Sequence, residues 1–116
     1  LRVATLTDAT YEWEHHVVTA KEAGLDEEEI GRVRAGGDAP GWSRDESALL
    51  RAVDECIADR CIRTSTLDAL GVSCSPEQVL DIVATVTMYH AMAIVTRTFA
   101  IPIDEEKPSF SIEDVE

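Results

Sequence analysis

Apolar residues recur every three or four positions along most of this chain, and polar capping residues or glycines stand where the recurrence stops. This spacing is typical of amphipathic α-helices, whose apolar side chains fall on one face. It predicts five helices, which span about residues 8–23, 26–35, 43–61, 65–70 and 75–99. No stretch alternates apolar and polar residues as a half-buried strand would. We therefore expect an all-α fold, with a single helical domain over residues 1–103.

The helix starts are marked by side chains that can accept hydrogen bonds from free backbone N–H groups. Asp26, Ser43 and Ser75 are each followed three residues later by Glu or Gln, which is the capping-box pattern. Asp8 and Ser65 are the expected caps of the other two helices. Each helix therefore has a start that can be read locally.

The last predicted helix, residues 75–99, is apolar nearly all round, which is typical of a helix buried on most sides. In so short a chain, some of that burial is expected to come from another subunit. Asp81, His90 and Arg97 make the segment too polar for a simple membrane span. Residues 104–116 are acidic and show no period, so we expect an extended or disordered tail.

Composition narrows the class of protein. The 116 residues are 45% hydrophobic but only 5% aromatic, which predicts a core made mainly of Ala, Val, Ile and Leu. With 23 acidic and 10 basic residues the net charge is −13, and so acidic a chain is not expected to bind nucleic acid or anionic membranes. The three cysteines form no Cys-x-x-Cys motif and do not resemble a secreted disulfide framework. No signal-peptide pattern opens the chain, so we expect a cytoplasmic protein, although the missing initiator Met suggests an upstream segment.

The candidate chemistry lies in the segment Tyr11-Glu12-Trp13-Glu14-His15-His16. Glu12 and His16 are four residues apart, so on a helix they share one face, whereas His15 faces away. A carboxylate beside an imidazole can act as a proton-transfer pair. It can equally be a structural pair, and the residues alone favour that interpretation because such pairs are common on helices.

Two further hypotheses involve His90, which follows Tyr89 in the most apolar predicted helix. His90 is either a hydrogen-bonded core histidine or, with Tyr89, part of the wall of the pocket that holds His16. Glu12, His16 and His90 would also suit a metal site of two histidines and one carboxylate, which is a weaker hypothesis. There is no phosphate loop and no dinucleotide-binding motif, and we expect no cofactor.

The same segment carries a family resemblance. Tyr-Glu-Trp-x-x-His at Tyr11 to His16, followed by Ala20 and Gly24, resembles the carboxymuconolactone decarboxylase and alkylhydroperoxidase D-like (AhpD-like) superfamily. The segments Gly-Trp-Ser at residues 41–43 and Tyr-His at residues 89–90 fit as well, and the resemblance extends over residues 1 to about 104. It implies an all-helical subunit that assembles into dimers, trimers or hexamers, and it favours a functional role for His16.

This chain departs from the family at informative positions. Peroxidase-type members carry a Cys-x-x-Cys motif whose two positions are Ala9 and Glu12 here, and a dithiol peroxidase needs both thiols. The resemblance then implies the decarboxylase-like branch, in which an acid–base histidine works on a small carbonyl or lactone acid. A family Glu upstream of the motif has no counterpart in this chain. Arg97 stands where relatives often have Asn, and it would pair with a substrate carboxylate or with Asp104 and the acidic tail.

The leading hypothesis is a homo-oligomeric enzyme in which His16 moves a proton and Glu12 holds its tautomer and balances its charge. The residues expected to contact the substrate are Trp13, Tyr89, His90 and Arg97. The alternative is a non-catalytic helical oligomer or binding protein on the same scaffold, with a metal-dependent enzyme as a weaker third possibility.

Overall fold

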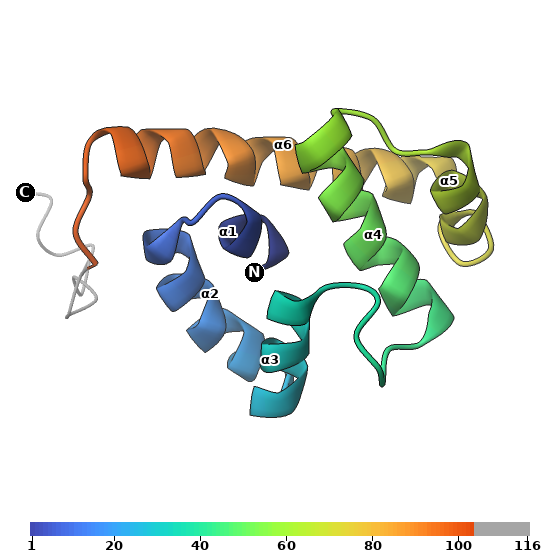
Figure 1. Cartoon of the computed structure of the whole chain (residues 1–116), viewed down its shortest axis with the longest axis horizontal. Helices are drawn as coiled ribbons and strands as arrows, with labels where there is room; N and C mark the ends of the chain where they lie inside the picture. Colours follow the sequence, from blue (N-terminus) through green and yellow to red (C-terminus); the bar gives the residue numbers. More distant parts are fainter. Residues whose placement is uncertain (104–116) are drawn as a thin grey trace, which may run out of the picture.

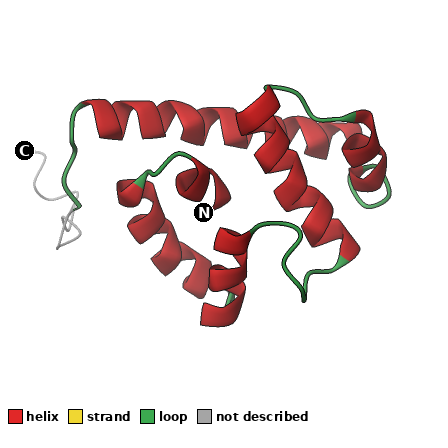
Figure 2. Ribbon diagram, in the orientation of Figure 1, coloured by secondary structure: helices red, strands yellow, loops and turns green. Residues whose placement is uncertain are grey.

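The computed structural model describes residues 1–103, and the predicted tail at 104–116 lies outside them. Figures 1 and 2 show helices joined by loops, and the described residues form no strand. The all-α prediction is confirmed, with one helix more than expected. The elements are α1 (Arg2–Leu6), α2 (Thr10–Glu22), α3 (Glu27–Ala35), α4 (Arg44–Asp59), α5 (Thr64–Leu70) and α6 (Pro76–Thr98).

The three predicted capping boxes are all present. Asp26, Ser43 and Ser75 accept a hydrogen bond from the backbone N–H three residues on, and the Glu or Gln there accepts one back from the capping residue's own N–H. Each box satisfies two backbone N–H groups that the helix itself leaves free. The starts of α3, α4 and α6 are therefore fixed by four-residue sequences.

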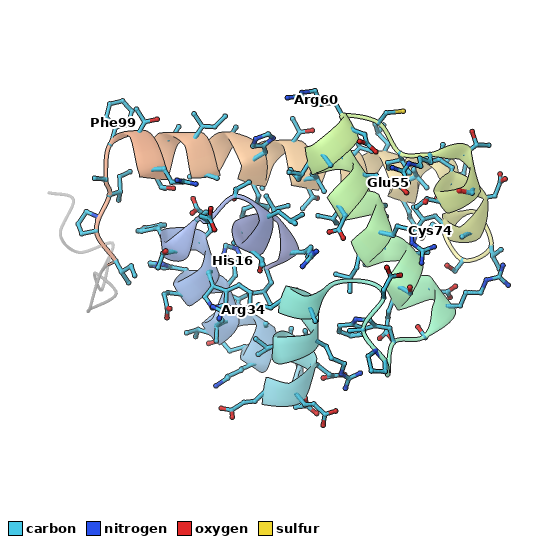
Figure 3. The ribbon with its side chains drawn as sticks, in the orientation of Figure 1. His16, Arg34, Glu55, Arg60, Cys74 and Phe99 are labelled. Atoms are coloured by element: carbon cyan, nitrogen blue, oxygen red, sulfur yellow. The ribbon has the colours of Figure 1, made fainter. Side chains whose placement is uncertain are left out.

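The other two predicted caps are wrong. Asp8 has a left-handed backbone with φ of 49° and does not cap α2, whose N-cap is Ala9. Ser65 lies inside α5. The start of α5 is instead held by the buried carboxylate of Glu55 on α4, which accepts hydrogen bonds from the backbone N of Arg63 and the hydroxyl of Thr66, both at 2.8 Å. Glu55 lies on a different helix from the one it caps (Figure 3). No pattern among neighbouring residues therefore predicts this cap.

The short helix α1, which the spacing did not predict, lies at the centre of the molecule and packs against α2, α3, α4 and α6 (Figure 1). Val3 of α1 shares a buried cluster with Val53 of α4 and Val86 of α6. Arg2 adds polar anchors, since its guanidinium bonds the Asp54 carboxylate of α4 at 2.6 and 3.1 Å. It also donates to two backbone carbonyl groups at the end of α3. Helix α1 thus joins the α2–α3 pair to the α4–α6 pair.

Helix α6 is the longest element and is largely uncovered in a single chain. Its buried residues are Val86, Ala93 and Thr96, and only 17% of its most apolar 18-residue stretch is buried. Exposed apolar side chains include Met88, Met92, Val95 and Phe99, of which Phe99 lies at the far end of the helix (Figure 3). By length and composition alone α6 could also cross a membrane, which the sequence did not lead us to expect. One copy of the chain therefore does not supply the all-round burial that its apolar character predicts.

Candidate active site

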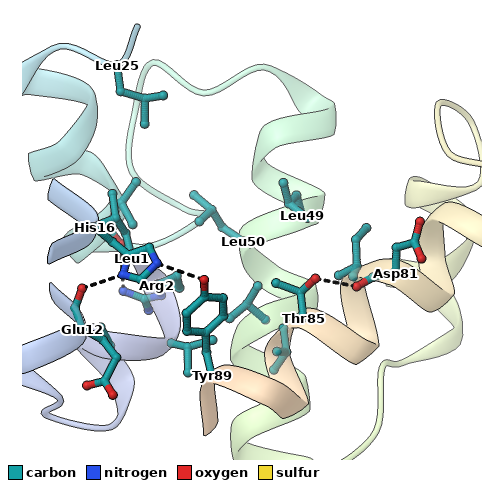
Figure 4. Close-up of a pocket in the computed structure, with 16 residues that line it drawn as sticks. Leu1, Arg2, Glu12, His16, Leu25, Leu49, Leu50, Asp81, Thr85 and Tyr89 are labelled. Carbon is teal, nitrogen blue, oxygen red and sulfur yellow. Dashed lines mark hydrogen bonds between the residues drawn. The ribbon is translucent and has the colours of Figure 1, made fainter. Parts of the chain in front are cut away.

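A cavity of about 430 Å³ opens beside α1, between α2, α4 and α6 (Figure 4). Most of its wall is aliphatic, with a few polar side chains set into it. The apolar lining consists of Leu1, Val3, Ala4, Leu25, Val33, Leu49, Leu50, Val53, Ile82 and Val86. The polar lining consists of Arg2, Glu12, His16, Asp81, Thr85 and Tyr89. An apolar cavity with a small number of fixed polar groups is the usual form of a small-molecule site.

His16 and Tyr89 meet in this wall. His16 lies on α2 and Tyr89 on α6, and the His16 Nε2 atom is 2.9 Å from the Tyr89 hydroxyl oxygen (Figure 4). The two rings lie edge to face, with centroids 4.9 Å apart and an interplanar angle of 86°. The hydrogen bond joins residues 73 positions apart in the sequence, so only the fold brings this pair together.

The tautomer of His16 follows from its other ring nitrogen. Nδ1 lies 2.9 Å from the backbone carbonyl oxygen of Glu12, and a carbonyl can only accept a hydrogen bond. Nδ1 therefore carries the proton, and in the neutral ring Nε2 is the unprotonated nitrogen. The Tyr89 hydroxyl donates to Nε2, so His16 is placed to accept a proton through Tyr89.

The side chain of Glu12 does not do what the sequence suggested. Its carboxylate points away from the imidazole (Figure 4) and lies 2.9 and 3.1 Å from the hydroxyl of Thr96 on α6. Glu12 is only 5% exposed, so this bond is made in the protein interior. The tautomer of His16 is held by the main chain at residue 12, which would do the same with another residue in that position.

Arg2 is the one cationic side chain among the described residues that line the cavity, and its donors are already in use. Its bonds to Asp54 and to the carbonyl groups of Val33 and Arg34 occupy four of the five N–H groups of the guanidinium. The Thr85 hydroxyl is likewise committed, since it donates to the Asp81 carbonyl oxygen at 2.7 Å. Tyr89 and His16 are therefore the groups best placed to recognise a bound molecule.

Three of the residues expected to contact the substrate lie elsewhere. Trp13 lines a separate cavity and stacks against the guanidinium of Arg34, 4.1 Å from the ring centroid. His90 and Arg97 line a third cavity together with Arg60. Although His90 follows Tyr89 directly, successive residues on a helix are about 100° apart around its axis, so the two face different cavities.

Arg97 is engaged with the turn between α1 and α2. It donates to the backbone carbonyl of Thr7 and lies 3.9 Å from the Asp8 carboxylate. Asp104, the other partner suggested for it, falls outside the described residues.

The geometry does not support the weaker metal hypothesis, because residues 1–103 contain no group of three or more His, Cys, Asp or Glu side chains placed to hold a metal ion.

The free cysteines, Cys56, Cys61 and Cys74, are absent from the described lining of the cavity. Burial raises the pKa of the Cys56 thiol, and the neighbouring Glu55 and Cys61 raise it further. A raised pKa lowers the fraction of reactive thiolate at neutral pH. The cavity thus offers imidazole and phenol chemistry, with no thiol from the described part of the chain.

Thr96 and Arg2 are the site residues that the sequence did not reveal. In the sequence Thr96 is one of several threonines in an apolar helix. Its partner Glu12 lies 84 positions away along the chain. Arg2 stands in a stretch with no predicted helix. Neither contact leaves a spacing pattern in the sequence, because both depend on how separate helices pack.

Comparison with known proteins agrees with this architecture. Residues 1–55 match the model of the carboxymuconolactone decarboxylase family. A crystal structure of a protein of unknown function from Agrobacterium tumefaciens, named as a candidate antioxidant defence protein AhpD, shares the fold with a TM-score of 0.82. That match has 21% sequence identity and covers 91% of this chain and 74% of the other. No curated protein matches the chain. The first 55 residues of the chain are thus similar to the carboxymuconolactone decarboxylase family, and the chain as a whole has the fold of the AhpD-like neighbour.

Proposed function

We propose that this protein is an enzyme in which His16 and Tyr89 move a proton on a small carbonyl or lactone compound bound in the apolar cavity. The observation that supports the proposal is the 2.9 Å hydrogen bond from the Tyr89 hydroxyl to His16 Nε2 in the cavity wall. An acid–base residue must reach its proton directly or through one bridging group, and this pair offers that arrangement.

The two residues would work as a relay. When the Tyr89 oxygen takes a proton from the substrate, its own proton passes to His16 Nε2, and the imidazole becomes positively charged. Nδ1 keeps its bond to the Glu12 carbonyl throughout, so the ring need not turn. The reverse transfer returns the proton to the substrate and restores the neutral pair. Side-chain acid–base catalysis of this kind typically contributes about a hundredfold to ten-thousandfold in rate.

Two reaction types fit this relay. Decarboxylation of a keto or lactone acid breaks the bond to the departing carboxyl group and leaves an enolate, which then needs a proton. Enolisation removes a proton next to a carbonyl and returns it, either to the same carbon or to another. In both, the Tyr89 hydroxyl would stabilise the enolate oxygen or donate the proton.

Dithiol peroxidase activity is not part of the proposal. Ala9 and Glu12 occupy the two positions where a Cys-x-x-Cys motif would place its thiols, next to His16. Peroxide reduction with a dithiol as electron donor, at a rate abolished by substituting Cys61, would show that the chain uses thiol chemistry after all.

The test is a screen of lactones, cyclic ketones and β-keto acids against the wild type and the His16→Ala variant. We expect turnover of at least one class by the wild type and its loss in the variant. His15→Ala is the matched control, because the His15 ring bonds the carbonyl of Tyr11 just as His16 bonds that of Glu12. His15 stacks on Tyr11 and is absent from the cavity lining, so its loss should leave activity intact. Activity unchanged by His16→Ala would refute the proposal.

The alternative is a non-catalytic helical oligomer or binding protein on the same scaffold, which the exposed apolar face of α6 would also suit. Oligomerisation is compatible with both functions, and we propose that the chain forms a homo-oligomer through this face. A protein that assembles and binds small ketones, yet shows no turnover anywhere in the screen, would support the alternative.

A further inference from the structure

We propose that the cavity lined by Arg60, His90 and Arg97 binds a small organic anion, at a site separate from the acid–base pair. The ligand class is a carboxylate or phosphate group carried on a short apolar body. This cavity has a volume of about 460 Å³ and shares no described lining residue with the cavity of His16 and Tyr89. The inference therefore goes beyond the function proposed above and does not rest on it.

The charge around this cavity is opposite in sign to that of the whole chain. The protein has a net charge of −13, yet the described lining includes two arginines and no Asp or Glu. Three other cavities of the molecule each have at least two carboxyl groups in their described lining. A positively charged hollow on an acidic protein is expected to concentrate anions.

Most of the hydrogen-bond donors in this wall are unused. Arg60 lies at the end of α4, beside α6 (Figure 3), and its exposed guanidinium makes no hydrogen bond or ion pair with the rest of residues 1–103. Arg97 uses one of its five N–H groups on the carbonyl of Thr7. Its distance of 3.9 Å to the carboxylate of Asp8 is too long for a hydrogen bond, and that carboxylate is 88% exposed.

His90 adds a donor between the two arginines' helices. Its ring makes no hydrogen bond with the described part of the chain, and in either neutral tautomer one ring nitrogen carries a proton that can be donated. Guanidinium groups bind the paired oxygens of a carboxylate or phosphate through short charge-assisted hydrogen bonds. The three side chains thus match an anionic group in both charge and hydrogen bonding.

The rest of the wall selects an organic anion over an inorganic one. The side chains of Leu6, Ile57, Ala93 and Ile94 form its apolar part, and Ile94 is 58% exposed. An inorganic ion would leave this surface in water, whereas a ligand with a hydrocarbon portion would cover it and gain from its burial.

Helix ends explain why the cations are tolerated here. Arg60 is the C-cap residue of α4 and Arg97 lies in the last turn of α6, where the helix dipole stabilises positive charge. This interaction accounts for each arginine separately. It does not account for their meeting with His90 and an apolar surface in one cavity that lacks carboxyl groups in its described lining.

The cavity would stay open if a second subunit covered the exposed methionines of α6. His90, Ile94 and Arg97 follow one another at intervals of four and three residues, so they share one face of the helix. Met92 and Arg97 are five positions apart, which places them about 140° apart around the helix axis. Anion binding and self-association through the methionine face are therefore compatible.

The test compares benzoate, phenyl phosphate and benzamide, which is an uncharged molecule of nearly the same shape as benzoate. Each is titrated into the nitrogen-15-labelled full chain and followed by two-dimensional NMR. We expect at least one anion to bind at least about tenfold more tightly than benzamide, a difference of about 1.4 kcal/mol, and to shift the amide signals of Arg60 and residues 90–98. The tighter of the two anions identifies the charged group. Equal binding of all three, or shifts confined to the cavity of His16, would overturn the inference.

Arg60→Gln makes the result specific, because Arg60 has no structural contact within residues 1–103 that the change would break, whereas Arg97 holds Thr7. We expect this variant to bind the anion about tenfold more weakly, since it loses a charge-assisted interaction. Arg44→Gln is the matched control: it removes the same charge from an exposed arginine at the opposite end of α4. Equal weakening in both variants would mean that the anion responds only to net charge, and the inference would fail.

Two further variants separate this site from other sources of the same effect. His16→Ala should leave anion binding unchanged, and a loss would place the anion in the other cavity. The chain itself carries carboxyl groups shortly after Arg97, at residues 104–106. The full chain with Asp104→Asn, Glu105→Gln and Glu106→Gln should bind the anion as the wild type does. Tightening by tenfold or more would show that the chain's own carboxylates occupy the cavity, which would overturn the proposal of a separate small ligand.

Discussion

At the scale of single residues, the hydrogen bond between Tyr89 and His16 is the centre of the proposed chemistry. Tyr89→Phe removes the hydroxyl and keeps the ring that packs against the imidazole. We expect kcat to fall about a hundredfold to ten-thousandfold, the usual contribution of acid–base catalysis. The measurement is steady-state kinetics on the best substrate of the screen, with circular dichroism to verify folding. A folded variant with wild-type kcat would mean that Tyr89 does not carry the proton.

The buried contact between Thr96 and Glu12 should matter for stability. Thr96→Val preserves shape but leaves the Glu12 carboxylate, which is 5% exposed, without that donor. An unsatisfied buried polar group costs about 1–3 kcal/mol, and we expect the free energy of unfolding to fall by that amount. Thr87→Val is the control, since Thr87 makes a similar bond to the carbonyl four residues back but is exposed on the same helix. Urea unfolding curves that shift equally for both variants would contradict this role.

Contacts between side chains of different helices could not be predicted from the sequence. The helical spacing of the motif separated His16 from His15, and in the structure His16 lines the cavity whereas His15 is absent from its lining. The partner of the His16 Nε2 atom did not follow from spacing, because Tyr89 and His90 are equally polar neighbours on a helix that is apolar nearly all round. Only the rotation of α6 against α1 and α2 decides that Tyr89 enters the cavity and His90 lines another.

At the scale of elements, the capping boxes that were predicted correctly involve residues close together in the sequence, whereas the helix that was missed depends on contacts with other helices. Asp26, Ser43 and Ser75 cap their helices through residues three positions away, and the sequence contains everything that such a cap needs. Helix α1 has five residues and no side-chain cap, so it shows too little of a period to be recognised. It is stabilised by tertiary contacts, chiefly those of Val3 and Arg2.

Arg2 should therefore contribute much of what holds α1 in place. Arg2→Gln removes a charge-assisted pair with Asp54, in which the arginine side chain is only 12% exposed, together with two bonds to the end of α3. We expect a loss of about 2–3 kcal/mol in the free energy of unfolding, as for hydrogen bonds to charged groups. Arg51→Gln breaks an exposed pair with Asp38 and should cost at most about 1 kcal/mol. Chemical denaturation of the two variants side by side measures the difference, and similar losses would show that Arg2 is not an anchor.

At the scale of the whole molecule, the sequence predicted a helical fold in which another subunit covers part of α6, but it could not say which face of α6 its own chain leaves exposed. An apolar residue in a sequence reveals that it prefers burial, without revealing whether its own chain or a second copy supplies the cover. In the structure, Met88, Met92, Val95 and Phe99 follow one another at intervals of three or four residues, so they form a stripe along one face. Their exposed fractions are 53%, 43%, 42% and 74%. A contiguous exposed apolar surface of this kind usually marks a site of interaction with another molecule.

We expect this α6 stripe to bind the same stripe of another subunit. Met92 lies near its middle, so Met92→Glu would place a charge in the apolar contact and favour dissociation, because a buried unpaired carboxylate is costly. Val72→Glu is the matched control, since Val72 is 72% exposed between α5 and α6, outside the stripe, and the added charge is the same. Sedimentation equilibrium in detergent-free buffer should give an oligomer for the wild type and for Val72→Glu, and a smaller species for Met92→Glu. A wild type that is monomeric at all concentrations, or that partitions into neutral lipid vesicles instead of self-associating, would show that something other than a second copy covers α6.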